Sequence, residues 1–115
     1  MMLRFPTSPT ATIRSNKQEA LDYEIAQEMA SALGRLGRAL ERALRILAEF
    51  DVAWPSGTRM TAEARDKRRK LIAEASRALW HFMVQREACG LRDGREVLRD
   101  YAVPPEVCGG MGVFP

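Results

Sequence analysis

Residues 71–84 constrain the fold of this chain more than any other stretch, because on a helix they are apolar over most of the circumference. The apolar and small side chains of this stretch include Leu71, Ala73, Ala75, Ser76, Ala78, Leu79, Trp80, Phe82, Met83 and Val84. Only Glu74, Arg77 and His81 form a polar line, which Gln85 continues. A helix of this kind needs neighbours on several sides, so we treat residues 71–84 as the centre of the fold.

The size and composition of the chain are those of one globular domain. Its 115 residues are enough to bury about two-thirds of the surface, and 46% hydrophobic with 29% charged residues argues against disorder. The net charge of +3 permits an anionic partner without requiring one. No apolar run reaches the roughly 18 residues of a membrane span, and residues 1–13 lack the apolar core of a signal peptide. We therefore expect a cytoplasmic protein.

No pattern in the chain is typical of a cofactor or metal site. Cys89 and Cys108 are expected to be reduced, packed thiols, and two cysteines without a CxxC pair do not form a zinc site. The Glu-x-x-His of a diiron bundle is missing, because Glu74 is followed by Arg77 at the third position. The glycine pairs follow no strand, so they form no phosphate loop. The sequence predicts no cofactor, no metal and no enzymatic activity.

Residues 1–15 are predicted to be an extended N-terminal arm, and residues 16–115 a single helical domain. The arm contains several residues that disfavour helix: Pro6, Ser8, Pro9, Thr10 and Thr12. Asn16 and Glu19 match a capping box, which predicts a first helix over residues 17–51. Apolar residues recur there at threes and fours, at Leu21, Ile25, Met29, Leu33, Leu36, Leu40, Ala43, Leu47 and Phe50. An unbroken helix of about 50 Å forces an elongated shape.

Two glycines raise the question whether this helix is continuous. Each of Gly34 and Gly37 costs about 1 kcal/mol relative to alanine inside a helix, so one interpretation is a break. The other is a stripe without side-chain bulk, made by Ala26, Ala30 and the glycines, along which a second helix can approach closely. We favour the continuous helix.

The remaining elements follow from turn and cap residues. Trp54-Pro55 and Ser56-Gly57 lie in a connector, residues 52–60, between antiparallel helices. A second helix is predicted over residues 61–88, begun by Thr61 and ended by Cys89-Gly90.

The C-terminal part is predicted to hold short pieces of helix. Asp93 and Glu96 suggest a capping box for a helix over residues 94–102, which Pro104-Pro105 stops. One further turn, 105–108, ends at Gly109-Gly110. Beyond it, three apolar residues are expected to fold back onto the hairpin: Met111, Val113 and Phe114.

Basic residues gather near the connector and form the candidate anion-binding site. Its residues are Arg38, Arg42 and Arg45 of the first helix and Arg68 and Arg69 of the second. The functional interpretation is a nucleic-acid or polyanion patch. The alternative is a solvated face, which pairs such as Asp66 with Lys70 support. A third is contact between the arginine face and the acidic start of a second copy, where Glu24 and Glu28 lie.

Two further segments are candidate binding sites. Glu74, Arg77 and His81 form a candidate polar pocket, which with Trp80 would suit a small molecule, although the line also fits a face in water. Residues 94–111 have the outline of a helix-turn-helix, but the second helix would be one turn long with Glu106 as its only charge. We therefore regard DNA binding through this segment as disfavoured.

Two stretches carry a family resemblance: SALGRLGRAL at residues 31–40 and LWHFMVQREACGLRD at residues 79–93. They resemble a family of short bacterial proteins of unknown function. The resemblance implies a bacterial, stand-alone domain and carries no activity, substrate or site residue.

The sequence therefore predicts an all-α fold, a long antiparallel helical hairpin with a short C-terminal helix. One hairpin cannot cover residues 71–84 on all sides. We expect a second chain to bury the flank near Trp80 and Val84 and the seam 36–50, which gives a homodimeric four-helix bundle. The predicted function is a non-catalytic interaction, scaffold or regulatory role. The alternative is weak nucleic-acid or polyanion binding.

Overall fold

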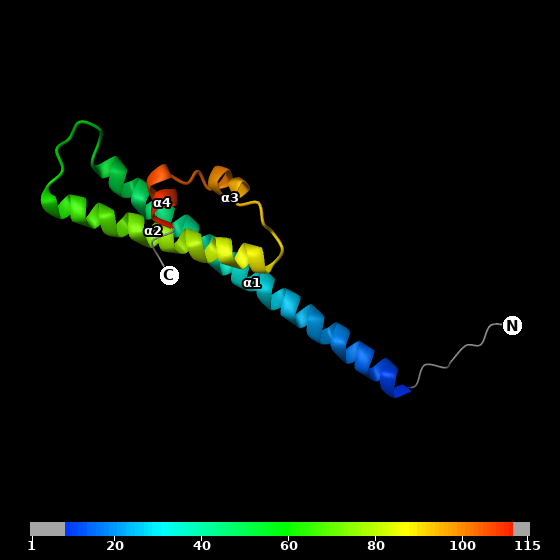
Figure 1. Ribbon diagram of the computed structural model, residues 1–115. Coiled ribbons are helices and arrows are strands. Elements are labelled where there is room, and N and C mark those ends of the chain that lie inside the picture. Colours follow the sequence, from blue (N-terminus) through cyan, green and yellow to red (C-terminus); the bar gives the residue numbers. More distant parts are fainter. Residues whose placement is uncertain (1–8, 112–115) are drawn as a thin grey trace.

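The computed structural model describes residues 9–111, with side chains from residue 13, and in that range every regular element is helical. The helices are α1 (Pro9–Ala53), α2 (Ala62–Ala88), α3 (Arg95–Asp100) and α4 (Pro105–Gly110). Helices α1 and α2 form a long antiparallel hairpin, and the short helices α3 and α4 lie against one side of it (Figure 1). The predicted all-α hairpin with a short C-terminal helix is confirmed.

Helix α1 begins earlier than the sequence pattern indicated. The extended arm predicted for residues 1–15 is wrong for residues 9–15, which are helical, and residues 1–8 lie outside the described part. Asn16 is therefore inside α1 and caps nothing. Pro9 suits the first helical position because its missing N–H needs no partner there. The threonines and serine that follow each cost only a few tenths of a kcal/mol in a helix.

The first helix is continuous through both glycines, as predicted, but only one glycine is needed for packing. A Cβ added at Gly37 would lie 3.0 Å from Tyr101 Oη and 3.2 Å from Phe82 Cε1. At Gly34 the same atom would meet only the end of the flexible Arg38 side chain, at 3.3 Å. Close approach is therefore confirmed at Gly37, where the rings of α2 and of the α3–α4 connection lie against the backbone of α1.

Turn chemistry closes the hairpin as predicted. Thr61 caps α2, its Oγ1 accepting from the Ala64 amide at 3.1 Å. Gly57 and Gly90 adopt positive φ, at 90° and 84°, in the connector and just beyond the end of α2. The observed bounds of α2 differ from those predicted by one residue at its start, since the capping threonine itself is not helical.

The C-terminal pieces depart from prediction in their limits. Helix α3 ends at Asp100 rather than residue 102, where Ala102 turns to a φ of 50°. Asp93 bonds the Arg95 amide, at 3.1 Å, and the predicted box with Glu96 does not form. Helix α4 continues through both glycines, because a Cβ at Gly110 would lie 2.7 Å from Ser76 Oγ and the absent side chain permits this contact. Met111 packs on the core as expected; Val113 and Phe114 lie outside the described residues.

The core is made where the hairpin meets the C-terminal pieces. Its buried apolar residues are Leu40 and Leu47 of α1, Ala75, Leu79 and Phe82 of α2, Val97 of α3 and Val107 of α4. Ser76 is also buried and donates from Oγ to the Val107 carbonyl at 2.8 Å, which ties α4 to the hub helix. Leu40 and Leu47 are 0% and 2% exposed within one copy, so the expectation that a second chain must bury this part of the seam is wrong.

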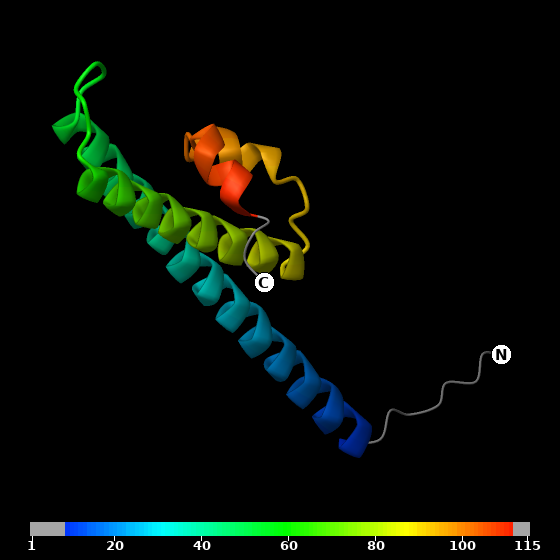
Figure 2. The ribbon, with the colours of Figure 1, turned by 60° about the vertical axis from the view of Figure 1, so that its left-hand side comes forward.

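The hairpin leaves two regions uncovered. On α2, Val84 keeps 45% of its surface exposed, while Trp80 beside it is half-buried. On α1, cover by α2 ends near Met29, whose carbonyl accepts from Gln85 Nε2 at 3.4 Å. The part of α1 before Met29 projects alone beyond the hairpin, as both ribbon views show (Figures 1 and 2). The molecule is accordingly elongated, with extents of 85 × 23 × 22 Å.

Candidate functional site

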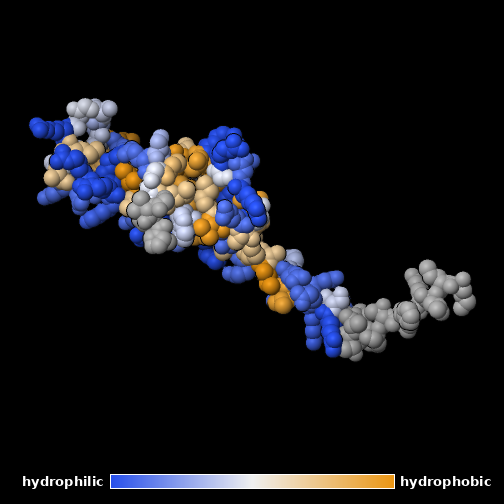
Figure 3. All heavy atoms as spheres, viewed as in Figure 1, coloured by the Kyte–Doolittle hydropathy of each residue, from blue (hydrophilic) through white to orange (hydrophobic). Residues whose placement is uncertain are grey.

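The projecting part of α1, which we call the overhang, comprises residues 13–28 and is exposed throughout. It carries four large hydrophobic side chains with about half or more of their surface in solvent: Ile13 (53%), Leu21 (49%), Tyr23 (69%) and Ile25 (49%). The space-filling view shows apolar atoms on this segment among hydrophilic ones (Figure 3). Leu21 and Ile25 lie one turn apart on one side of this helix, and no neighbour from the described part of the chain covers them.

The apolar face continues from the overhang along the hairpin. We define the open seam as Leu21, Ile25, Ala32, Ala39, Ile46 and Phe50. At 3.6 residues per turn these positions fall within an arc of about 60°. Ile46 is 40% exposed, and the two alanines are half-buried outside the core cluster. One side of α1 is therefore apolar over nearly its whole length and lies beside the core rather than in it.

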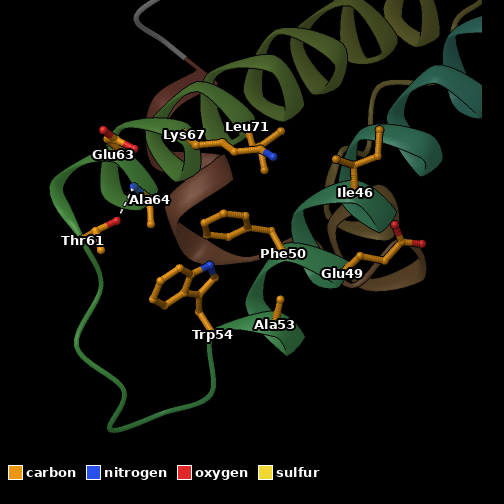
Figure 4. Close-up of a pocket in the computed structure, with 10 residues that line it drawn as sticks. All are labelled: Ile46, Glu49, Phe50, Ala53, Trp54, Thr61, Glu63, Ala64, Lys67 and Leu71. Carbon is orange, nitrogen blue, oxygen red and sulfur yellow. Dashed lines mark hydrogen bonds between the residues drawn. The ribbon is translucent and has the colours of Figure 1, made fainter.

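Near the connector the open seam enters a groove between α1 and α2, of about 560 Å³. Its lining residues are Ile46, Glu49, Phe50, Ala53, Trp54, Thr61, Glu63, Ala64, Lys67 and Leu71. Phe50 and Trp54 stack with their ring centroids 6.5 Å apart, and Figure 4 shows both rings between the two helices. The groove has an aromatic and aliphatic floor with charged side chains at the rim, a composition that suits an apolar side chain from a helix.

An ionic cluster lies beside this groove and joins three helices. The Arg68 guanidinium of α2 donates from Nε to Asp51 Oδ1 of α1 at 2.8 Å and from Nη1 to Glu106 Oε2 of α4 at 2.6 Å. Second bonds from Nη2 reach Asp51 Oδ2 at 3.2 Å and Glu106 Oε1 at 3.0 Å. The hydrogen bond to Glu106, and after it the bond to Asp51, raises the pKa of Arg68. The hydrogen bond from Arg68 in turn lowers the pKa of Glu106.

The structure divides the candidate anion-binding residues. Arg68 binds two carboxylates of its own chain, and Arg69 is exposed and lies 3.8 Å from Asp66. A cavity of about 720 Å³ at the connector is lined by Arg65, Arg68 and Arg69, but also by Asp51 and Glu106. Arg38, Arg42 and Arg45 are exposed on α1 and do not line that cavity. The five arginines are therefore not brought around one site.

The candidate polar pocket lies at the surface. Glu74, Arg77 and His81 are all exposed, as a face in water would have them. The imidazole of His81 meets the Trp80 ring edge-on, with centroids 5.1 Å apart and planes at 73°. None of the three residues lines the groove or the connector cavity.

Ligands for a metal ion do not assemble in the part of the chain that the structure describes: no three His, Cys, Asp or Glu residues form a suitable group there. Cys89 and Cys108 are free and half-buried. None of the helices described is both long and apolar enough to cross a bilayer.

Sequence reasoning missed the ionic cluster and the groove. Asp51 and Glu106 are separated from Arg68 by 17 and 38 positions, so no helical spacing signals the contacts. The only sequence hint was Glu106, a single carboxylate in an otherwise uncharged turn.

Comparison with known proteins identifies a family without identifying a function. Residues 8–115 match the model of a family described as a family of unknown function (DUF6665), and the chain belongs to that family. The resemblance to an uncharacterised family is thereby confirmed, while bacterial origin stays a prediction. No curated protein and no solved structure matches the chain.

Proposed function

We propose that this member of a family of unknown function is a non-catalytic helical protein that acts as a homodimer in an interaction, scaffold or regulatory role. The observation that carries the proposal is the overhang. Its apolar side chains Leu21 and Ile25 are half exposed, and no other part of the described chain covers them. A second copy offers a complementary apolar surface.

Helix energetics support this proposal. An isolated helix shorter than about 12–15 residues is marginal in water even with good helix formers, and most helix stability in proteins comes from packing an apolar face. The overhang contains Ser15, Asn16 and the β-branched Ile13 and Ile25, none of which is a strong helix former. Burying the exposed half of a leucine or isoleucine contributes about 1 kcal/mol per side chain. Cover by a second chain would therefore stabilise the part of α1 that is least stable alone.

The arrangement of charge supports a role in which the protein binds through helix faces. The guanidinium of Arg68 is satisfied by two carboxylates and joins three helices. This is a structural use of charge, since a group with four such hydrogen bonds has little capacity for an external ligand.

A second candidate, weak binding of nucleic acid or another polyanion, is favoured by Arg38, Arg42 and Arg45, which are exposed along α1. The pairing of Arg68 weakens it, because the basic residues near the connector are partly neutralised. Retention on a nucleic acid that falls steeply with added salt would support this candidate; binding that is absent at low salt would reject it.

Sedimentation equilibrium of the full chain tests the homodimer. Each chain has a mass of 12.9 kDa, and the proposal expects twice that mass at micromolar concentration, with dissociation on dilution. A single species of monomer mass across the micromolar range would reject it. The experiment needs no knowledge of a further partner.

A further inference from the structure

We infer that the homodimer is antiparallel, with the overhang of each copy lying along the open seam and over the groove of the other copy. This inference rests on the proposed homodimer and adds its orientation and its contacts. Residues 13–28 of the second copy therefore cover the groove and the part of the open seam next to it.

The position of the overhang on α1 is the first argument. The overhang occupies one end of α1 and the groove the other, with the two alanines of the open seam between them. In a two-fold antiparallel pair, each copy offers one overhang and one groove, so that both surfaces are covered in a closed dimer. With the two-fold axis near residue 33, Leu21 of one copy comes opposite Ile46 of the second, and the start of the overhang comes level with Trp54. The small Ala32 lies near the axis, where the helices must approach most closely.

The charges that border the open seam are the second argument. One flank of α1, on the side away from Leu40 and Leu47, carries in order Lys17, Glu24, Glu28, Arg35, Arg42 and Glu49. These six residues fall within an arc of about 60° and are all exposed. Their signs run plus, minus, minus, plus, plus, minus.

This order of charges is complementary to its own reverse. When two copies run in opposite directions about an axis near residue 33, Lys17 meets Glu49 and Glu24 meets Arg42. Glu28 and Arg35 lie close to the axis and are offset from each other by about three residues along the helices. The same flank faces its equivalent in an antiparallel helix pair, where opposite charges favour pairing. When two copies run in the same direction about a two-fold axis along the helices, the two flanks lie on opposite sides of the interface, and these charges do not meet. Within one copy Glu28 lies 3.6 Å from Arg35, so the two central charges of the flank pair along the helix.

Charge reversals in the full chain distinguish the two orientations. Glu24→Arg and Arg42→Glu each convert two attractive pairs of the antiparallel dimer into repulsive ones, which should weaken the dimer about tenfold. The double variant Glu24→Arg/Arg42→Glu restores opposite signs and should restore the dissociation constant. In a parallel dimer the two equivalent flanks lie on opposite sides of the interface and their charges do not meet, so all three variants should match the unchanged chain.

A matched control is Glu19→Arg, which makes the same charge change on the opposite side of the overhang and should leave the dissociation constant unaltered. Circular dichroism checks that each variant keeps its helix content. Weakening by both single variants with recovery in the double variant supports the antiparallel dimer. A dimer that both single variants leave intact overturns the orientation while the homodimer stands. A monomeric unchanged chain overturns both proposals.

Discussion

Arg68 of α2 donates to Glu106 of α4, with Nη1 2.6 Å from Oε2. The same guanidinium holds Asp51 at the end of α1, so one side chain joins the two legs of the hairpin and the last helix. Residues far apart in the chain are thereby tied at the closed end of the molecule. Because α4 is only six residues long, this tie, the hydrogen bond from Ser76 to the Val107 carbonyl and the burial of Val107 in the core hold it on α2.

Glu106→Gln should destabilise the protein by about 0.5–1 kcal/mol, since the substitution removes a charged acceptor of Arg68 at a half-exposed position. Urea unfolding gives the free energy, and amide exchange should show faster opening in α4 than in the middle of α2. Glu96→Gln, at an exposed position in α3, is the control and should change stability little. Equal effects of the two substitutions would contradict the tie.

The stability that Glu106 contributes should depend on pH. Its folded pKa is lowered by the hydrogen bond from Arg68, so the unfolded chain binds this proton more readily. The contribution is therefore present above the unfolded pKa of about 4.3 and is lost as pH falls through the lower folded pKa. Measured between pH 6 and pH 3, the difference in unfolding free energy between the unchanged chain and Glu106→Gln should shrink below about pH 4. If this difference in unfolding free energy instead grew as the pH fell, the prediction that Arg68 lowers the folded pKa of Glu106 would be wrong.

The two glycines of α1 should respond in opposite ways to alanine. Gly34→Ala should raise stability by about 0.5–1 kcal/mol, because helix propensity improves and only the mobile end of Arg38 must shift. Gly37→Ala should lower it by about 1–2 kcal/mol, because the added methyl meets Tyr101 and the packed ring of Phe82. Thermal unfolding of both variants measures the contrast. Similar melting temperatures would show that the close approach at Gly37 is easily relaxed.

The open seam should be the face of the overhang that matters for association. Ile25→Asp places a charge in the seam and should weaken the dimer at least tenfold. Tyr23→Asp changes a more exposed residue, 69% against 49%, on the opposite side of the same helix, and should leave association unaltered. Sedimentation of the two variants at matched concentrations compares them. If Tyr23→Asp is the more damaging, the interface lies on the other face of α1.

The sequence by itself determined the helices, the hairpin and the place of the hub. Apolar residues at threes and fours, Trp54-Pro55 and the capping Thr61 act over a few positions, so a pattern can reveal them. The same reasoning placed the start of α1 too late, at Asn16 instead of Pro9. Asn16 can cap a helix, but the residues before it can also be helical, and the local pattern does not decide between the two. The sequence pattern also predicted that the last helix ends before Gly109, because glycines commonly end helices. In the structure α4 continues to Gly110, whose missing side chain leaves room for Ser76.

Only the tertiary structure decided which local features have a structural use. Gly34 and Gly37 look alike in sequence, and the neighbouring rings make one of them necessary. Arg68 and Arg69 are adjacent and alike in sequence. Only Arg68 contacts both Asp51 of α1 and Glu106 of α4, so it joins three helices and is not a free anion-binding residue. The physical reason is the same in each case: these contacts join residues that lie far apart along the chain, and helix periodicity carries information over only a few turns.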